Sequence, residues 1–383
     1  MVADEHKPPL LILGVHTKCE GNPNTLYRLH ELVAADVFDV SEINVPLIFG
    51  MERPLDSLHP MKIVWGAFVA HLSVFLRYML KKTPSRAYVP YPAVFVLVLL
   101  SFLPRFMRPR LLIADAFISF YDTLVNDRHL LRVAGLVARC LYALEKRAYN
   151  CADILVVDTP QNAVFFQQLF SLSAHKLEPL PLAINEADFG FKSYLPDKTI
   201  CQVLFIGTMI PLHGVDTIAH AAILLASRHD IRFKFIGDGQ DARFLQDKFD
   251  DNRLHLEWTR KWLSSAELAE AIGQADICLG IFGAGDKTQR VCPIKLYAYA
   301  SVGRTAITGD TLWLREATRN IGYKPFASVP VNDPQALAGM IASLADDPVK
   351  RSQYAANASK FYHESLANKV AMTKLLELLK QGA

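Results

Sequence analysis

The chain has 383 residues, 51% of them hydrophobic, so it is globular and long enough for two cores rather than one. Its formal net charge is only +3, which argues against nucleic acid as a partner. The six cysteines form no C-x-x-C pair, which argues against a zinc site or a disulfide framework and indicates a reducing cytoplasm.

The first half of the chain predicts a strand, a loop and a helix, followed by further buried strands. Residues 10–15 (LLILGV) form a short apolar run, and a helical pattern follows over 25–33. Residues 110–114 and 154–157 are again apolar, and each run ends at polar or capping residues. Such runs are typical of parallel strands that carry polar groups at their carboxyl ends.

From residue 201 onward, predicted strands and helices alternate at short intervals. The strands are expected at 203–207, 231–237, 254–258, 276–282 and 305–308, and helices at 214–228, 264–273 and 293–302. This repeated alternation predicts a doubly wound parallel sheet. The polar stretch 185–199 has little periodicity and is the expected linker.

We therefore expect an α/β chain of two Rossmann-like domains. The first covers 1–190 and contains a basic apolar segment at 61–110, the second covers 199–360, and a helix at 361–383 returns to the first domain. Ligands bind beyond the carboxyl ends of the strands in such sheets, so two facing domains would form a cleft.

Two glycine-bearing turns follow strands of the second domain. The first contains Gly207, Thr208, His213 and Gly214, and the second contains Gly237, Asp238 and Gly239. Glycine lets backbone N–H groups approach a phosphate closely, and the following helix N-terminus adds positive potential. Packing alone also explains each turn, because glycine is common after a strand.

A cluster of cations follows the apolar run 275–281. Its members are Lys287, Arg290 and Lys295. A solvated loop is the ordinary interpretation of such a cluster. Its place at a strand's carboxyl edge, beside Gly283 and before Pro293, favours convergence on one small anion such as a diphosphate.

The order GTMIPLHGVDTIAHA, FIGDG, ADICLGIFG and PIKLYAYASVGRTAIT resembles the C-terminal half of retaining glycosyltransferases of the GT-B fold, family 4 type. The resemblance covers about residues 200–350 well and the first half loosely. It implies a nucleotide-diphosphate sugar held by the second domain and an acceptor that enters from the first. It also implies neither cofactor nor metal. No Asp-x-Asp motif occurs, which suits a leaving diphosphate neutralised by side-chain cations and helix amides.

The chain departs from the family pattern at four positions. The family's G-R-x-x-x-x-K-G turn has Thr208 and His213 in place of its Arg and Lys, its ribose-binding Glu is Ala298, and a usual Pro is Thr305. Two interpretations are open: the charge has been relocated to Lys287 and Arg290, or the site has decayed. Relocation is favoured, because decay would not explain new cations at the mouth of the same pocket.

The resemblance implies roles for the candidate site residues. Lys287, Arg290 and Lys295 would stabilise charge on the departing diphosphate. Asp115 would face the donor sugar, unless it only caps a helix. The donor-binding candidates are Gly207, Thr208, His213, Gly214, Gly237, Asp238, Gly239, Trp258, Arg260, Gly283 and Tyr297. Trp258 either stacks on the base or packs in the core.

Candidate acceptor-binding residues lie in the loop after the first strand. They are His16, Asn22 and Asn24. Turn chemistry is the alternative explanation for Asn22 and Asn24, which flank a proline.

The segment 57–114 combines apolar runs with positive charge. It contains no Asp or Glu and eight Lys or Arg residues. Its run between Pro92 and Pro104 has 11 residues, against about 20 needed to span a bilayer. It predicts a surface that lies on anionic headgroups and therefore a lipid-linked acceptor. The alternative is a buried helix and a core strand with cations at the rim.

The sequence thus predicts a retaining glycosyltransferase of bacterial surface polysaccharide synthesis, peripheral on the inner face of the cytoplasmic membrane. The opening residues MVADEHKPP lack the features of a secretory signal, consistent with this location. Two alternatives remain: a nucleotide-sugar 2-epimerase of the same fold, and a degenerate, non-catalytic binding subunit at the membrane.

Overall fold

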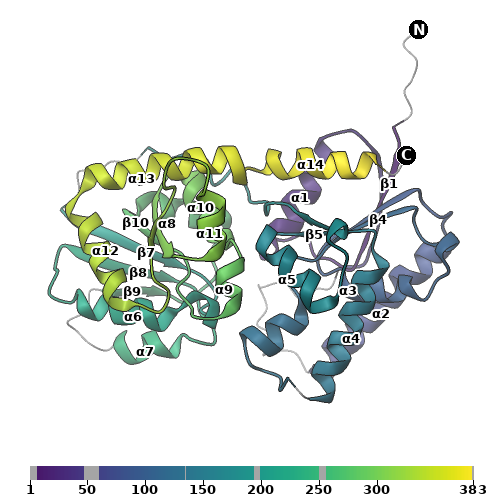
Figure 1. Cartoon of the computed structure of the whole chain (residues 1–383), viewed down its shortest axis with the longest axis horizontal. Coiled ribbons are helices and arrows are strands. Elements are labelled where there is room, and N and C mark those ends of the chain that lie inside the picture. The colour runs from purple at the N-terminus through teal and green to yellow at the C-terminus, as the bar shows by residue number, and fades with distance from the viewer. Residues whose placement is uncertain (1–6, 47–59, 134, 194–198, 250–255, 382–383) are drawn as a thin grey trace, which may run out of the picture. The chain divides into compact units, whose positions relative to one another are not determined.

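The structure is a computed structural model, and it describes residues 7–46, 60–133, 135–193, 199–249 and 256–381 (Figure 1). The chain forms two compact units. Unit 1 comprises Met1–Ala183 and Asn368–Ala383, and unit 2 comprises Ile184–Ala367. Three predicted segments fall partly outside the described residues: the linker at 194–198, the start of the strand at 254–258, and the end of the last helix at 382–383.

Unit 1 is built on a six-stranded parallel sheet in the order β2-β1-β3-β4-β5-β6. The strands are β1 (Pro9–Gly14), β2 (Asp39–Asn44), β3 (Arg86–Val89), β4 (Leu111–Asp115), β5 (Ile154–Val157) and β6 (Leu177–Pro179). The longer helices are α1 (Pro23–Ala34), α2 (Pro60–Met79), α3 (Val94–Ser101), α4 (Leu136–Cys151), α5 (Pro160–Phe170) and α14 (Asn368–Lys380).

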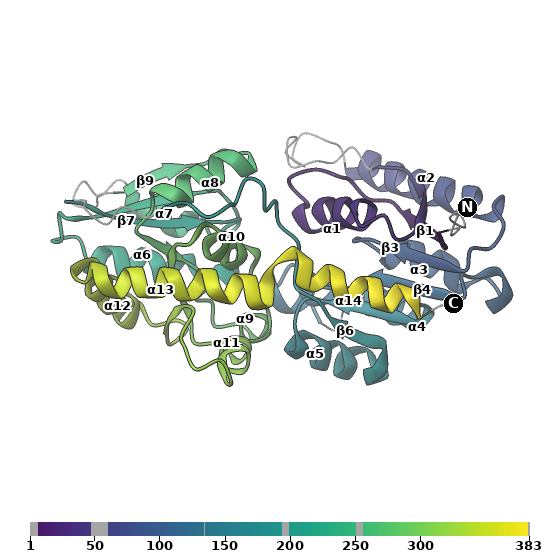
Figure 2. The ribbon, with the colours of Figure 1, turned by 90° about the horizontal axis from the view of Figure 1, so that it is seen from above.

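Alternation along β1 assigns the two faces of this sheet. Leu10 and Ile12 pack with α1 and α14, whereas Leu11 and Leu13 pack with α2 to α5. Helix α14 lies along α1 (Figure 2), and the Arg86 Nε–H donates to the Leu379 carbonyl at 2.7 Å. The last helix of the chain therefore completes the core of unit 1.

Unit 2 has a second six-stranded parallel sheet, in the order β12-β11-β10-β7-β8-β9. The strands are β7 (Cys201–Ile206), β8 (Ile231–Ile236), β9 (Leu256–Thr259), β10 (Ile277–Leu279), β11 (Thr305–Gly309) and β12 (Ala327–Val329). The helices are α6 (Val215–Leu224), α7 (Arg243–Phe249), α8 (Ser265–Gln274), α9 (Asp286–Arg290), α10 (Ile294–Val302), α11 (Leu312–Thr318), α12 (Pro334–Asp346) and α13 (Pro348–Phe361).

The predicted fold class is confirmed, since both sheets are parallel and flanked by helices. Strands β2, β3, β6 and β12 were not predicted, because they are short or, in β2, largely polar. The strand expected at 276–282 is shorter, ending at Leu279, because the chain leaves the sheet at Gly280. The helix expected at 214–228 ends at Leu224, where it passes into a turn.

The basic apolar segment divides into two parts with different surroundings. Strand β3 is fully buried, and α3 carries the buried Val94, Val96, Leu97 and Leu100. The expectation of one surface over 61–110 is therefore wrong for this part, because these residues fill the core between the sheet and α4. Helix α2 differs, because it exposes large apolar side chains.

Truncation of the α14 side chains tests whether this helix holds unit 1 together. Leu375 and Leu379 are 1% and 0% exposed. We expect Leu375→Ala and Leu379→Ala each to lower the free energy of unfolding by about 2–5 kcal/mol, because each leaves a cavity. Urea denaturation measures this, with the exposed Lys380→Ala as control. Equal stability of all three variants would show that α14 contributes no packing energy.

Candidate functional site

The predicted donor residues of unit 2 lie at the carboxyl edge of its sheet. Strands β8 and β9 lie on one side of β7, and β10 lies on the other. The loops after β7 and β10 therefore lead to opposite faces of the sheet, and β7 and β10 form a topological switch point. Ligands in open α/β sheets bind beyond the carboxyl ends of the strands at such a point. The Gly207 turn follows β7, and Gly283 and the cation cluster follow β10.

Lys295 is a buried cation at this point. It is the second residue of α10 and only 8% exposed. Its Nζ lies 4.0 Å from the centroid of the Phe205 ring and 3.4 Å from the Gly280 carbonyl oxygen. Within the described residues it forms no ion pair, and burial lowers its pKa well below the ordinary value. An anion beside this amine would therefore be strongly favoured.

The side chains of Lys295 and His213 converge on Gly207. A Cβ placed on Gly207 would lie 2.9 Å from Lys295 Nζ and 2.7 Å from His213 Cε1. The buried His213 ring also packs edge-on against Phe205, with 5.6 Å between centroids. Only glycine leaves room for both heads at this turn. The Phe205 ring contacts both the His213 ring and the Lys295 amine.

The other glycines allow close approach of backbone segments. Gly214 has φ +63° and faces the Phe282 backbone, while a Cβ on Gly283 would lie 2.2 Å from the Pro211 carbonyl oxygen. Gly237, at φ +121°, and Gly239 face the Gly207 turn in the same way. These requirements fix the Gly207 turn between the loops after β8 and β10.

The amides of these glycines donate within the fold. Their acceptors are the Ile236 carbonyl for Gly207, Pro211 for Gly214, Thr259 for Gly237, the Asp238 carboxylate for Gly239, and the Leu212 carbonyl for Gly283. Their observed role is therefore close packing. The anion-binding character of the edge rests instead on side chains and on the start of α10.

The three predicted cations have different surroundings. Arg290 is 6% exposed, and its Nε lies 3.3 Å from a carboxylate oxygen of Asp286. Lys287 is half-buried on the same short helix, α9. Helix α9 packs against the 3-10 turn Pro211–His213, so it lies at the edge that holds Gly207. Lys295 alone of the three is shown directly against the Gly207 turn.

Trp258 and Arg260 lie where β8 and β9 end. The Arg260 guanidinium is 4.7 Å from the Trp258 ring centroid and forms a 2.9 Å ion pair with Asp238. The indole N–H donates to the Gly237 carbonyl at 2.8 Å. The indole is thus fixed by the glycine turn, and Arg260 covers one of its faces.

Three further positions of the family pattern lie in the core: Tyr297 and Ala298 on α10, and Thr305 at the start of β11. Tyr297 is 1% exposed and Ala298 8%. Thr305, at the usual proline position, donates its hydroxyl to the Arg351 carbonyl at 2.6 Å and so ties β11 to α13. This hydroxyl contact accounts for the threonine at that position.

In unit 1, Asp115 is a buried carboxylate at the end of β4. It is 1% exposed, and its oxygens accept hydrogen bonds from the Tyr88 hydroxyl at 2.8 Å and the Tyr91 N–H at 3.4 Å. Arg28 lies 3.5 Å away and also donates to the Pro181 carbonyl. Burial raises the pKa of Asp115, although Arg28 and the hydrogen bonds lower it. Its role toward a donor sugar stays a prediction.

The candidate acceptor residues are held by contacts within unit 1. His16 is buried 3.2 Å from Glu42, and burial lowers its pKa to about 4, so it is neutral at neutral pH. Asn24 accepts a hydrogen bond from the Ala183 N–H at 2.9 Å, whereas Asn22 Nδ2 lies 3.9 Å from the Cys19 sulfur. His16 follows β1 at the β1–β3 switch point of this sheet.

Two residues that contact the candidate sites, Phe205 and Arg28, were not predicted from the sequence. Phe205 belongs to a buried strand pattern, and nothing in that pattern distinguishes a ring that supports a cation from one that only fills the core. Arg28 lies inside a helix, and its carboxylate partner is 87 positions away.

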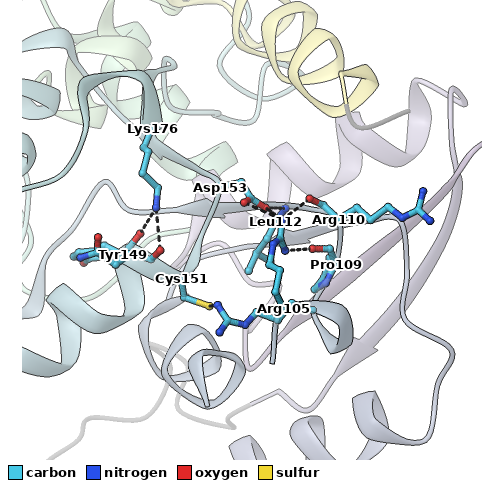
Figure 3. A network of polar contacts seen from close by, with 10 residues as sticks. Arg105, Pro109, Arg110, Leu112, Tyr149, Cys151, Asp153 and Lys176 are labelled. Carbon is cyan, nitrogen blue, oxygen red and sulfur yellow. Dashed lines mark hydrogen bonds and ion pairs between the residues drawn. The ribbon is translucent and has the colours of Figure 1, made fainter. Parts of the chain in front are cut away.

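A separate polar network lies at the amino edge of the unit 1 sheet. Arg105 bridges the Pro109 and Arg110 carbonyls and the Asp153 carboxylate, while Lys176 donates to the last carbonyls of α4 (Figure 3). These contacts join the loops that lead into β4, β5 and β6. They give two cations of the basic apolar segment a structural role: Arg105 and, through its contact with Cys151, Arg108. Among the described residues, no three His, Cys, Asp or Glu side chains gather into a possible metal site.

Comparison with known structures defines the fold class. Sucrose-phosphate synthase from Thermosynechococcus elongatus is 14% identical, with a TM-score of 0.71 over 97% of this chain and 98% of its own. HepE of Anabaena, determined with UDP, is 12% identical, with a TM-score of 0.64 over 97% of this chain and 100% of its own. TarM of S. aureus is 12% identical, with a TM-score of 0.61 over 80% of this chain and 58% of its own. The chain therefore has the GT-B fold of glycosyltransferases.

The family comparison concerns unit 2. Residues 201–347 match the family model described as Glycosyl transferases group 1. Comparison with curated proteins gives no significant match. The domain match and the fold together support a glycosyltransferase at the general level.

The cost of burying Lys295 predicts an unusual stability effect. We expect Lys295→Met to raise the free energy of unfolding at neutral pH by about 1–4 kcal/mol, because it removes the cost of burying an amine that is charged in the unfolded chain. The native pKa is lowered, so wild-type stability should rise with pH between that pKa and about 10.4, the unfolded value. Lys295→Met should lack this rise.

Urea unfolding at a series of pH values measures both effects, and Lys324→Met, at an exposed lysine of unit 2, is the control. A less stable Lys295→Met protein with an unchanged pH profile would show that the native ammonium is compensated.

Proposed function

We propose that this protein is a retaining, metal-independent glycosyltransferase that moves a sugar from a nucleotide-diphosphate sugar to a lipid-linked glycan acceptor. The reaction would take place at the inner face of the cytoplasmic membrane, in bacterial surface polysaccharide synthesis. The observation that carries the donor assignment is Lys295, a buried cation without an ion pair among the described residues, placed against the Gly207 turn. The group 1 domain match supports the same assignment.

The diphosphate would lie over the Gly207 turn, with Lys295 beside its β-phosphate. Negative charge grows on that phosphate as its bond to the anomeric carbon breaks, so a fixed cation stabilises the transition state more than the ground state. Lys287 and Arg290 on α9 would supply further positive charge from the same edge. Attack on the same face of the sugar gives retention, as the sequence resemblance implies.

The nucleoside would extend toward Trp258 and Arg260. The Trp258 indole and the Arg260 guanidinium form a flat, partly exposed surface at the end of β9, which is suited to stacking on a base. UDP is the first nucleotide to test, because HepE of Anabaena was determined with it. Asp238 and the Gly239 turn would border the same pocket.

The acceptor would bind unit 1. His16 lies at the β1–β3 switch point, where loops of the unit 1 sheet diverge, and is neutral at neutral pH. A neutral imidazole is able to orient a hydroxyl group without attracting the donor's anion. Asp115 and Arg28 underlie this edge and would hold its shape.

Donor binding tests the assignment. We expect UDP to raise the melting temperature of the wild type, and Lys295→Met to weaken UDP binding by about 100-fold, because one charge-assisted contact is lost. A bound diphosphate raises the lowered pKa of Lys295, so wild-type affinity should fall as pH rises through the free-state value. Calorimetry over a pH series measures this, with Lys324→Met as control.

If Lys295→Met and the Lys324→Met control lowered the affinity for nucleoside diphosphates equally, the role of Lys295 would be refuted. Binding without transfer or hydrolysis in a panel of sugar nucleotides would instead favour the non-catalytic binding subunit.

If the positive charge of the family's site has been relocated to Lys287 and Arg290, substitution of these α9 residues should slow catalysis. We expect Lys287→Ala and Arg290→Ala to lower kcat on the order of 100-fold, equivalent to about 3 kcal/mol of barrier. Arg290 is buried, so Arg290→Lys is included to separate charge from packing. Sugar release from the sugar nucleotide found to bind is measured, with the melting temperature of each variant. Unchanged kcat in both alanine variants would remove α9 from the reaction.

A further inference from the structure

Helix α2 exposes a continuous row of large apolar side chains along its length. These residues, together called the α2 stripe, are Val64, Trp65, Phe68, Val69, Leu72, Leu76, Met79 and, directly after the helix, Leu80. They are between 38% and 90% exposed. At 3.6 residues per turn they cover an arc of roughly 160°. Contiguous exposed apolar surface of this kind marks an interaction site.

Within the part of unit 1 that the structure describes, the α2 stripe is the exposed side of the helix. The opposite side of the helix carries Ala70, Val74 and Tyr78, which are buried in the core beneath the sheet. The Tyr78 hydroxyl also donates to the Met107 carbonyl at 2.7 Å. The helix is thus held from one side, and it lies on the outside of unit 1 (Figure 2). No helix in the described ranges is long and apolar enough to cross a membrane.

The borders of the α2 stripe are positively charged. Lys62 lies near its start, and Arg77, Lys81 and Lys82 lie at its end, all of them exposed. No Asp or Glu occurs in 57–114. The adjacent strand β2 contributes Glu42, but this carboxylate is 2.7 Å from Lys18. The stripe is therefore apolar with a cationic rim.

We propose that the α2 stripe docks on the surface of an anionic phospholipid bilayer, with the helix axis parallel to the membrane plane. The apolar side chains, with Trp65 near the first turns, would enter the boundary between headgroups and acyl chains. The lysines and Arg77 would contact lipid phosphates. This inference rests on the proposed function for its purpose, since it names the surface on which a lipid-linked acceptor is met.

Charge complementarity favours a bilayer over a second copy of the chain. Antiparallel pairing of two α2 stripes would bring Lys62 of one copy toward Lys81 and Lys82 of the other. The segment has no carboxylate to neutralise them. Like charges opposed at an interface are unfavourable, whereas an anionic bilayer supplies the missing negative charge.

Vesicle binding of the full chain, without nucleotide, tests the proposal. We expect co-sedimentation with vesicles of phosphatidylcholine and phosphatidylglycerol, weaker binding to phosphatidylcholine alone, and release by salt. The tryptophan emission should shift to shorter wavelength on binding. Trp65→Phe should abolish most of that shift while retaining binding, since Trp65 enters the interface.

Two variants separate the apolar and the charged contributions. Trp65→Ser combined with Phe68→Ser should reduce vesicle affinity about 100-fold, because each large side chain contributes roughly tenfold. Lys81→Gln combined with Lys82→Gln should reduce affinity for phosphatidylglycerol vesicles by roughly fivefold per lysine and leave binding to phosphatidylcholine unchanged. Val349→Ser, at a 78% exposed residue of α13, is the matched control.

All substituted side chains are exposed, so the melting temperatures should match the wild type. Absence of binding to phosphatidylglycerol vesicles at low salt would overturn the proposal, and so would equal binding by the Trp65 and Phe68 double variant. Concentration-dependent dimerisation that the double variant abolishes would assign the stripe to a second copy instead. None of these outcomes bears on UDP binding, which is measured without lipid.

Discussion

The burial of one amine, that of Lys295, determines how the candidate site is organised. A buried cation with no carboxylate partner among the described residues lowers the stability of the protein, and an anionic ligand reverses that cost. The Phe205 ring and the Gly280 carbonyl hold the amine in place without neutralising it. In the proposed function, a diphosphate beside this amine would stabilise its charged form.

Glycine at five positions makes this burial possible. Gly207 leaves room for the Lys295 and His213 heads, and Gly214, Gly237, Gly239 and Gly283 let neighbouring loops pack against the same turn. The amides of these glycines donate within the fold, so the loops are held by hydrogen bonds of the protein itself. A preorganised positive site of this kind needs no rearrangement when charge develops.

The two units bury charge in opposite ways. In unit 1, Asp115 is satisfied by Tyr88, Tyr91 and Arg28, so its carboxylate stabilises the loops around it. In unit 2, Lys295 has no such counter-charge among the described residues. A satisfied buried charge indicates a structural role, and an unsatisfied one indicates a binding role. Among the four predicted residues Asp115, Lys287, Arg290 and Lys295, this contrast makes Lys295 the strongest candidate for ligand binding.

The sequence by itself determined the fold class and the order of elements in unit 2, because short apolar runs, glycine turns and helical periodicity are local properties of the chain. It also located the segment that carries Lys287, Arg290 and Lys295. Only the tertiary structure decided that Lys295 is desolvated, that Arg290 is paired with Asp286, and that Asp115 is enclosed. It likewise divided the basic segment into a buried α3 and an exposed α2. Burial and pairing depend on neighbours brought from distant parts of the chain, and no local pattern specifies them.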